Sequence, residues 1–206
     1  MFSRNSKLER QQLCGCHVID ASVNFISVER YWFLTWTTYG TWLPGDHRGF
    51  VGQALDESGA FVNYNQIGML PAPPDPQWNR TAEQNLQSPA VVLNHEQAEA
   101  VFDQRQETAS IRSWLLIAVG IMRTHLHLVV GVPSDPDPEK LLGDFKAYGT
   151  RRLNRERGQP LGNSWWTKGG SKRKLLGEQA LTNAVEYVRQ QANPMLIWTR
   201  EAGRLL

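Results

Sequence analysis

The sequence is poor in cysteine: it has two in 206 residues, both within the triplet Cys14-Gly15-Cys16. One such pair makes neither a tetrahedral zinc site nor a disulfide framework, so we expect reduced thiols. Long apolar runs are also lacking, because no stretch approaches the roughly 18 residues that a membrane-spanning helix needs. The basic residues of 1–10 are not followed by an apolar stretch that would predict a secretory signal. We therefore expect a cytoplasmic protein.

An excess of one charge sign is absent from the whole chain but present in one part of it. The 22 basic and 20 acidic residues give a net charge of +2. Residues 144–174 alone hold nine basic and two acidic side chains, a charge of +7, which leaves −5 for the rest. A basic segment in an otherwise acidic chain favours an anionic polymer as partner, although charge runs also occur on solvated helix faces.

Hydrophobic periodicity predicts alternating strands and helices. Aromatic and β-branched residues at 31–39 predict a strand, and the Gly- and Pro-containing residues that follow predict an insertion at about 52–93. The elements expected beyond it are a helix after the N-cap candidate Asn94, strands at 111–122 and 124–132, a helix opening at 135–139 and running to about 157, a strand at 165–176 and a helix at 178–192.

This order predicts an α+β fold, a ferredoxin-like antiparallel sheet with helices packed on it. The short connection between the strands at 111–122 and 124–132 favours an antiparallel hairpin. The chain is long enough for one compact domain, which we place at 31–200 with an N-terminal arm at 1–30 and the insertion after the first strand.

Two histidines in the second strand of the hairpin are the first chemical signal. His125 and His127 alternate with Leu126 and Leu128, so both imidazoles point to one face of the sheet. Neutral imidazoles this close can share one divalent cation. A partly buried histidine pair without metal is an equally ordinary interpretation of so short a motif.

The last predicted helix supplies partners for that pair. Tyr187 and Gln191 lie one turn apart and flank an apolar stripe, Leu181, Ala184, Val185 and Val188. If the helix packs beside the histidine strand, the amide oxygen of Gln191 completes a ligand set and the phenol lies near a bound phosphate. A phenol with a pKa of about 10 is a weak nucleophile at neutral pH, so it needs a cation that polarises the phosphate.

Together these motifs resemble the HUH single-tyrosine transposases of small bacterial insertion sequences and their relatives, the REP-associated tyrosine transposases. The resemblance rests on His125-Leu126-His127 as the His-hydrophobic-His motif and on Tyr187-Val188-Arg189-Gln190-Gln191 as the Tyr-x-x-x-Gln helix motif. A basic helix at 146–157 and an aromatic strand at 164–176 occupy the expected places between them. The insertion has no counterpart in the smallest members of the family.

The resemblance implies a role for each of these residues. Tyr187 is expected to be the nucleophile, and His125, His127 and Gln191 are expected to bind a divalent metal, Mg²⁺ or Mn²⁺. The implied activity is cleavage and strand transfer of single-stranded DNA at hairpin ends, through a 5′-phosphotyrosine and a free 3′-OH. Hairpin DNA is the expected partner, and a homodimer with the tyrosine acting in trans is common among such transposases, although REP-associated relatives can be monomeric.

The basic segment supplies the expected DNA contacts, which position a strand without reading its sequence. They are Lys146, Arg151, Arg152, Lys172, Arg173 and Lys174. Trp165 and Trp166 alternate across their predicted strand, so at most one can face a groove and stack on a base. Tyr148, on the basic helix, is the reserve nucleophile, but Arg152 one turn later cannot bind a metal.

The sequence is also compatible with three other functions. The fold could bind DNA hairpins without cutting them, although the complete His-x-His and Tyr-x-x-x-Gln motifs argue against lost activity. An RNA-binding ferredoxin-like module would leave the histidine pair unexplained and lacks an RNP-like aromatic motif. A metal-dependent hydrolase would use water in place of Tyr187 and would form no covalent protein–DNA adduct.

Overall fold

The computed structural model describes residues 28–48, 50, 52–55, 60–64, 73–162 and 164–205. Nearly all of the expected arm at 1–30, including Cys14 and Cys16, lies outside the described residues.

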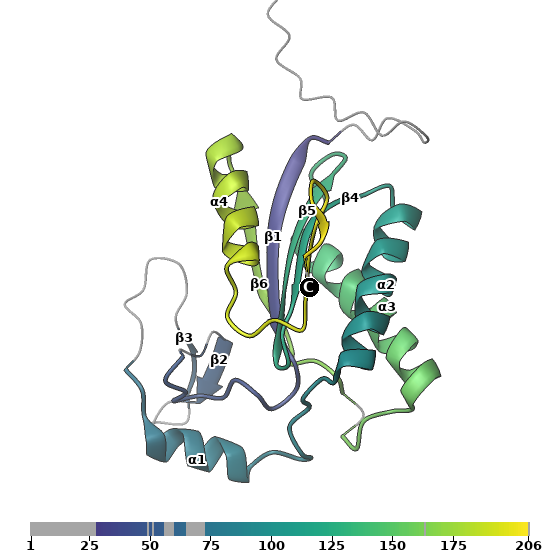
Figure 1. Ribbon diagram of the computed structural model, residues 1–206. Helices are drawn as coiled ribbons and strands as arrows, with labels where there is room; N and C mark the ends of the chain where they lie inside the picture. The colour runs from purple at the N-terminus through teal and green to yellow at the C-terminus, as the bar shows by residue number, and fades with distance from the viewer. Residues whose placement is uncertain are drawn as a thin grey trace, which may run out of the picture.

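An antiparallel sheet forms the centre of the molecule, with the strand order β6-β1-β5-β4-β7-β8 (Figure 1). The strands are β1 (Arg30–Thr37), β4 (Leu115–Ile121), β5 (His125–Val132), β6 (Ser171–Leu175), β7 (Leu196–Thr199) and β8 (Gly203–Arg204). Strands β4 and β5 form the predicted hairpin. The α+β, ferredoxin-like prediction is confirmed, because β6-β1-β5-β4 is the four-stranded order that two βαβ units with a central hairpin produce.

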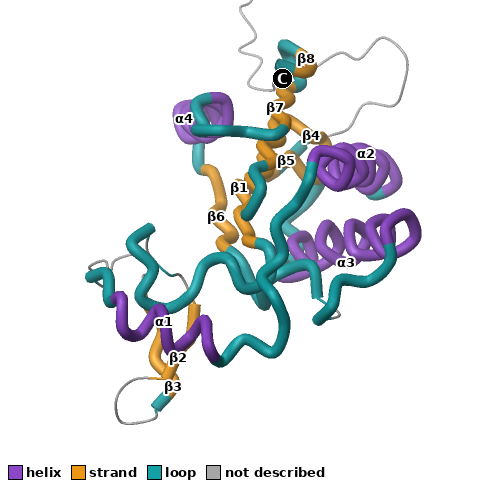
Figure 2. Tube along the Cα trace, turned by 60° about the horizontal axis from the view of Figure 1, so that its bottom comes forward, coloured by secondary structure: helices purple, strands orange, loops and turns teal. Residues whose placement is uncertain are grey.

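Helices cover both faces of this sheet, but unequally. Helices α2 (His95–Ile111) and α3 (Pro138–Arg157) lie side by side on one face, and α4 (Glu178–Arg189) lies alone on the other (Figures 1 and 2). Strand alternation in β1 assigns Trp32, Leu34 and Trp36 to the large core under α2 and α3. Phe33 points the other way, into the smaller cluster beneath α4. The sheet therefore separates a well-filled core from a thinner, more accessible face.

The predicted start of α2 is confirmed by its cap. Oδ1 of Asn94 accepts a hydrogen bond from the Gln97 amide, and Oε1 of Gln97 accepts one from the Asn94 amide, both at 2.9 Å. This reciprocal pair satisfies two amide groups that a helix start otherwise leaves without partners, and such a cap typically contributes about 1 kcal/mol.

The insertion is more ordered than the sequence predicted. It contains helix α1 (Pro76–Gln84) and a separate hairpin of β2 (Gly52–Leu55) and β3 (Phe61–Tyr64). The proline run suggested a loop, but Pro76 occupies the first turn of α1, where its missing amide costs nothing. Asp75 caps that turn by accepting hydrogen bonds from the amides of Gln77 and Trp78.

Two strand predictions were too long. The strand expected at 111–122 begins only at Leu115, because Ile111 ends α2 with its side chain 68% exposed and Ser113 turns the chain at φ 55°. The strand expected at 165–176 is reduced to β6 and an isolated bridge at Trp166, because Gly169 and Gly170 turn the backbone at φ 80° and 151°.

The C-terminal region also differs from the prediction. Helix α4 ends at Arg189 rather than at 192, and β7 and β8 add two strands that the sequence patterns did not predict. These strands are short, and β7 pairs with the distant β4 rather than with a sequence neighbour. A pairing of this kind leaves almost no local signal.

Candidate active site

The histidine pair lies on the face of the sheet that α4 covers. Alternation along β5 places His125 and His127 on this face, with their ring centroids 5.1 Å apart, while Leu126 and Leu128 enter the opposite core. His127 is 3% exposed. The predicted shared orientation of the two imidazoles is therefore present.

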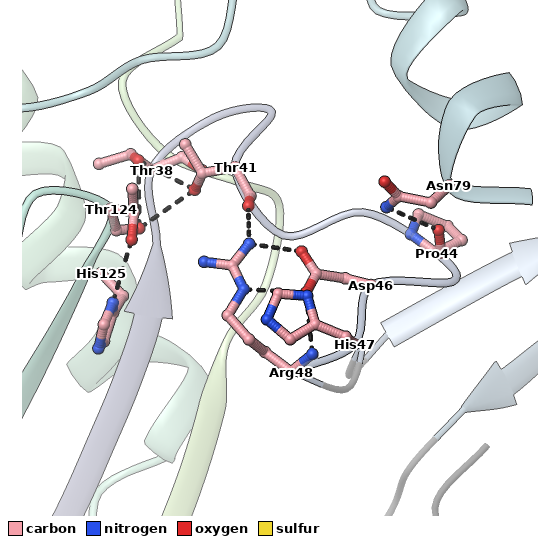
Figure 3. Close-up of polar contacts among 9 residues, drawn as sticks. All are labelled: Thr38, Thr41, Pro44, Asp46, His47, Arg48, Asn79, Thr124 and His125. Carbon is pink, nitrogen blue, oxygen red and sulfur yellow. Dashed lines mark hydrogen bonds and ion pairs between the residues drawn. The ribbon is translucent and has the colours of Figure 1, made fainter. Parts of the chain in front are cut away.

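Both imidazoles are held through Nδ1. Oγ1 of Thr35 lies 2.8 Å from Nδ1 of His127, and Oγ1 of Thr124 lies 3.2 Å from Nδ1 of His125 (Figure 3 draws the latter). Nε2 of His127 is buried and has no hydrogen-bond partner among the described residues. A buried polar atom without a partner costs about 1–3 kcal/mol, so this nitrogen is suited to a ligand that binds its lone pair.

Burial keeps both imidazoles neutral. It lowers the pKa of His127 to about 3, with a smaller contribution from neighbouring His125 and an opposing one from Gln191. It also lowers the pKa of His125, which Gln191 raises and the charge of Arg48 lowers further. Neutral imidazole is the form that binds a metal ion.

Helix α4 brings the other two predicted residues to the same place. The Tyr187 ring meets the His127 ring edge-on at 5.1 Å between centroids, and the Tyr187 side chain is half exposed. Gln191 lies just beyond the helix end, yet its Nε2 still donates to the Tyr187 carbonyl at 2.9 Å. The Gln191 side chain is close enough to raise the pKa of both imidazoles, so all four predicted residues lie together.

Two aromatic residues that the motif analysis did not single out complete the surroundings. Phe33 stacks on His127 at 5.5 Å and meets Tyr187 edge-on at 5.7 Å. Trp42 lies against His125 at 5.2 Å. Alternation along the first strand could have placed Phe33 on the histidine face, but no local pattern places Trp42, which follows a turn.

The donor set fits a divalent cation. The described residues contain no group of three His, Cys, Asp or Glu side chains that could hold a metal ion. Nε2 of Gln191 is used by the Tyr187 carbonyl, which leaves the amide oxygen for the imidazole side. Two imidazole nitrogens and one amide oxygen form a mixed set that suits Mn²⁺ or Mg²⁺ with water as further ligands.

The predicted DNA contacts are distributed over both faces of the sheet. Nζ of Lys146 donates to the carbonyls of Thr167, at 2.5 Å, and Gly169, at 2.7 Å. Lys172 and Lys174 point to the α3 side, where they pair with Glu139 and Asp135. Three consecutive residues of a strand cannot share one face, and these two lie opposite the histidines.

Of the remaining basic candidates, Arg173 lies nearest the candidate active site. Its guanidinium is 5.3 Å from the centroid of the Phe33 ring, on the histidine face. Arg151 and Arg152 lie on α3, across the sheet, where Arg151 covers Tyr148 and Arg152 pairs with acidic neighbours. Tyr148 is thus separated from the histidines by the sheet, unlike Tyr187.

Neither Trp165 nor Trp166 faces a groove, which is compatible with the prediction that at most one of them could. Both side chains are buried, at 4% and 6% exposure. Nε1 of Trp165 donates to the Asn154 side chain at 2.7 Å, and Nε1 of Trp166 donates to the Lys146 carbonyl at 3.1 Å. The glycine turn that follows replaces the predicted continuous strand, so the expected alternation does not apply and both indoles pack against α3.

Comparison with known proteins identifies the family. The family model described as "Transposase IS200 like" matches residues 88–191, half of the chain and all four residues of the candidate active site. The chain belongs to this transposase family. Comparison with curated protein sequences gives no significant match.

Two solved structures are similar to this IS200-like transposase. One is a REP-associated tyrosine transposase bound to a REP hairpin, with 12% identity, a TM-score of 0.43, and coverage of 82% of this chain and 70% of that one. The other is described as a candidate transposase from Deinococcus radiodurans, with 15% identity, a TM-score of 0.44, and coverage of 85% and 99%. These identities and TM-scores are too low for either likeness to bear on function.

Family membership makes this a DNA-binding transposition protein of a class that cleaves and rejoins DNA. None of the helices in the described part of the chain is both long and apolar enough to span a bilayer.

Proposed function

We propose that this transposase cuts and rejoins single-stranded DNA beside hairpins, with Tyr187 as nucleophile and His125, His127 and Gln191 as ligands of Mg²⁺ or Mn²⁺. The observation that carries the proposal is the edge-on contact of Tyr187 with His127, at 5.1 Å between ring centroids. It places a half-exposed phenol beside a buried imidazole whose Nε2 lacks a partner. The hairpin substrate and the cytoplasmic location follow from the resemblance and the composition.

The reaction proceeds by transesterification. Oη of Tyr187 forms a bond to the scissile phosphorus as the bond from phosphorus to the 3′ oxygen breaks. The phenol proton passes to bulk water, which the half-exposed side chain can reach, and the departing oxygen takes up a proton as the free 3′-OH. The product is a 5′-phosphotyrosine that keeps the energy of the phosphodiester for rejoining. A bound cation would polarise the phosphate and stabilise charge on the departing oxygen.

The protein's own groups prepare this step. Thr35 holds the His127 ring through Nδ1, and Phe33 fixes the ring from its face. Phe33 also supports Tyr187, so the nucleophile and one ligand share a rigid apolar base. Gln191 is tied to the Tyr187 carbonyl, which couples the third ligand to the nucleophile. Such prior ordering reduces the entropy lost on reaching the reactive geometry.

The test is formation of a covalent adduct. The protein is incubated with labelled single-stranded hairpin oligonucleotides and Mn²⁺, and adducts are resolved on a denaturing gel. Wild-type protein is expected to form an adduct that Tyr187→Phe abolishes and Tyr148→Phe retains. An adduct lost in Tyr148→Phe but kept in Tyr187→Phe would overturn the choice of nucleophile.

The same assay separates the alternative functions. Cleavage without any adduct indicates a hydrolase in which water attacks. Hairpin binding without cleavage indicates a non-catalytic DNA-binding protein with the same fold. Binding of an RNA hairpin in preference to its DNA equivalent would indicate an RNA-binding module.

A further inference from the structure

The loop that follows β1 is joined directly to the histidine strand. The carbonyl of Thr124, the residue before His125, accepts hydrogen bonds from the Thr38 amide at 2.9 Å and from Oγ1 of Thr41 at 3.2 Å. Oγ1 of Thr38 donates to the same oxygen at 3.1 Å (Figure 3). A carbonyl with this many donors is held firmly, so residues 41–48, which we call the Arg48 loop, have a fixed position beside His125.

Two side chains of the Arg48 loop form a stack at the edge of the candidate active site. Trp42 lies against His125, with ring centroids 5.2 Å apart. The guanidinium of Arg48 covers Trp42, 5.1 Å from its ring centroid. Figure 3 shows this guanidinium on the side of its loop that faces His125.

The guanidinium is oriented by its own loop. Nε of Arg48 donates to Oδ1 of Asp46 at 2.9 Å, Nη2 donates to Oδ2 of Asp46, and Nη2 also donates to the Thr41 carbonyl at 2.7 Å. Nη1 has no hydrogen-bond partner among the described residues, and the Arg48 side chain is 37% exposed. An arginine held in this way keeps one end of its planar fork ready for an oxyanion.

The insertion supports this loop from behind. Gly45 accepts a hydrogen bond from the Asp75 amide at 3.0 Å, and the Asn79 side chain donates to the Pro44 carbonyl at 3.2 Å. The contact is tight at Gly45, where an added Cβ would lie 2.3 Å from the Asp75 carbonyl oxygen. Helix α1 and its N-cap Asp75 therefore hold the outer side of the loop, as the hydrogen bonds to the Thr124 carbonyl hold its inner side (Figure 3).

We propose that Arg48 binds a phosphate of the single-stranded DNA next to the cleavage site, and that the insertion serves to hold it there. The proposal rests on the function proposed above, because it takes the strand to lie across His125. A guanidinium that projects from a rigid loop toward the histidine pair, with a nitrogen to spare, is suited to one backbone phosphate. Arg48 is thus a DNA-binding residue at the cleavage site, in addition to the proposed nucleophile and the three proposed metal ligands.

A purely structural role for Arg48 makes a different prediction. In that case Arg48 and Asp46 act together as a brace of the loop, and removing either one has the same effect. If Arg48 binds phosphate, the two substitutions affect DNA binding differently. Asp46→Asn removes a negative charge from the protein surface that faces the DNA, whereas Arg48→Gln removes the positive charge that contacts the phosphate.

The experiment measures the salt dependence of DNA binding. A fluorescein-labelled hairpin oligonucleotide with single-stranded flanks is titrated with protein in EDTA, so that no cleavage occurs, and the anisotropy is followed at several NaCl concentrations. The proteins compared are wild type, Arg48→Gln, Asp46→Asn and Arg80→Gln, the last removing an exposed arginine of α1. Circular dichroism melting shows whether each variant is folded.

Loss of one phosphate contact has a defined size. The slope of log K against log salt should flatten by about 0.7 in Arg48→Gln, since one contact with a single strand is removed. Affinity at low salt should fall about tenfold, as for one charge-assisted hydrogen bond. Asp46→Asn should keep a slope at least as steep as wild type, and Arg80→Gln should match wild type.

Other outcomes overturn the proposal. A slope in Arg48→Gln equal to that of wild type shows that Arg48 binds no phosphate. If Arg48→Gln and Asp46→Asn lower the DNA affinity equally, Arg48 acts only as a structural brace of the loop. If Arg48→Gln and Arg80→Gln lower it equally, Arg48 contributes only general electrostatic attraction of the protein for DNA. Because binding is measured without metal and the adduct assay with Mn²⁺, a failure of this proposal can be told apart from a failure of the proposed function: the first changes the salt dependence of binding, and the second the Tyr187 adduct.

Discussion

Thr35 and His127 are direct partners across the β1–β5 pairing, and Oγ1 of Thr35 lies 2.8 Å from Nδ1 of His127. This contact engages Nδ1 and leaves Nε2 as the ring nitrogen without a hydrogen-bond partner among the described residues. In the tautomer that binds a metal ion through Nε2, Nδ1 carries the proton and donates to the Thr35 hydroxyl.

Replacing Thr35 with valine removes the hydroxyl and keeps the shape. We expect Thr35→Val to weaken Mn²⁺ binding about 10- to 100-fold, because the tautomer and orientation of His127 are no longer fixed. Thr37→Val is the matched control, since Thr37 lies two residues along the same face but donates to Thr167. Isothermal titration calorimetry would measure both, and equal affinities for the two variants would contradict the assigned role of Thr35.

Gln191 offers a second test of the ligand set. Gln191→Ala should lower Mn²⁺ affinity about 10-fold or more, since it removes the only proposed amide ligand. Gln190→Ala is the control, because the adjacent Gln190 donates to Glu186 on the exposed side of α4. Melting temperatures measured without metal should be similar for the two variants. Unchanged Mn²⁺ affinity in Gln191→Ala would remove Gln191 from the proposed ligand set.

Arg105 is a buried cation in the large core. Its guanidinium lies over the rings of Trp36, Phe145 and Trp166, but Nε and Nη2 have no hydrogen-bond partner among the described residues. Burial lowers its pKa to about 9, which reflects the cost of holding the charge there. We expect Arg105→Met to unfold at the same or a higher urea concentration than wild type, because a well-packed apolar side chain removes that cost.

Arg105→Ala should behave in the opposite way. It leaves a cavity between the sheet and α3, and such truncations typically cost about 3 kcal/mol or more. A loss in Arg105→Met as large as that in Arg105→Ala would show that stacking on the three rings outweighs desolvation of the charge.

The buried amine of Lys146 should make the stability of the protein depend on pH. Burial is the main cause that lowers its pKa to about 8 from 10.5, with help from the charge of Lys172. Between these values the unfolded chain binds a proton that the folded protein does not, so the contribution of Lys146 to stability improves as pH rises from about 8 toward 10.5. Below about pH 8 the penalty for burying the charged form is fully present.

Chemical denaturation at several pH values tests this. The free energy of unfolding of wild type should rise relative to that of Lys146→Gln between about pH 8 and 10. Between about pH 6 and 7 the difference between the two proteins should be constant. Lys140→Gln, at an exposed position of the same helix, should track wild type throughout. A difference between wild type and Lys146→Gln that is constant at all pH values would contradict the shifted pKa.

Much of the fold could be predicted because its signals are local. The capping residue Asn94, the alternation around His125 and His127, and the apolar stripe of the last helix are each read within a few residues. The helices and strands that were predicted correctly are those whose own residues carry such local patterns. Strand β7 was missed because its pairing partner, β4, is far away in the chain. The start of β4 was misplaced because the apolar Ile111 belongs to the end of α2.

The sequence by itself determined the family and the four residues that converge, because the His-x-His and Tyr-x-x-x-Gln spacings follow from the strand and helix periods. Only the tertiary structure decided their surroundings. It placed Phe33 beneath both His127 and Tyr187, moved Lys172 and Lys174 to the opposite face, and brought the Arg48 loop to His125. The physical reason is that periodicity is set by the local backbone. Contacts between residues far apart in the sequence depend instead on how strands pair and helices pack.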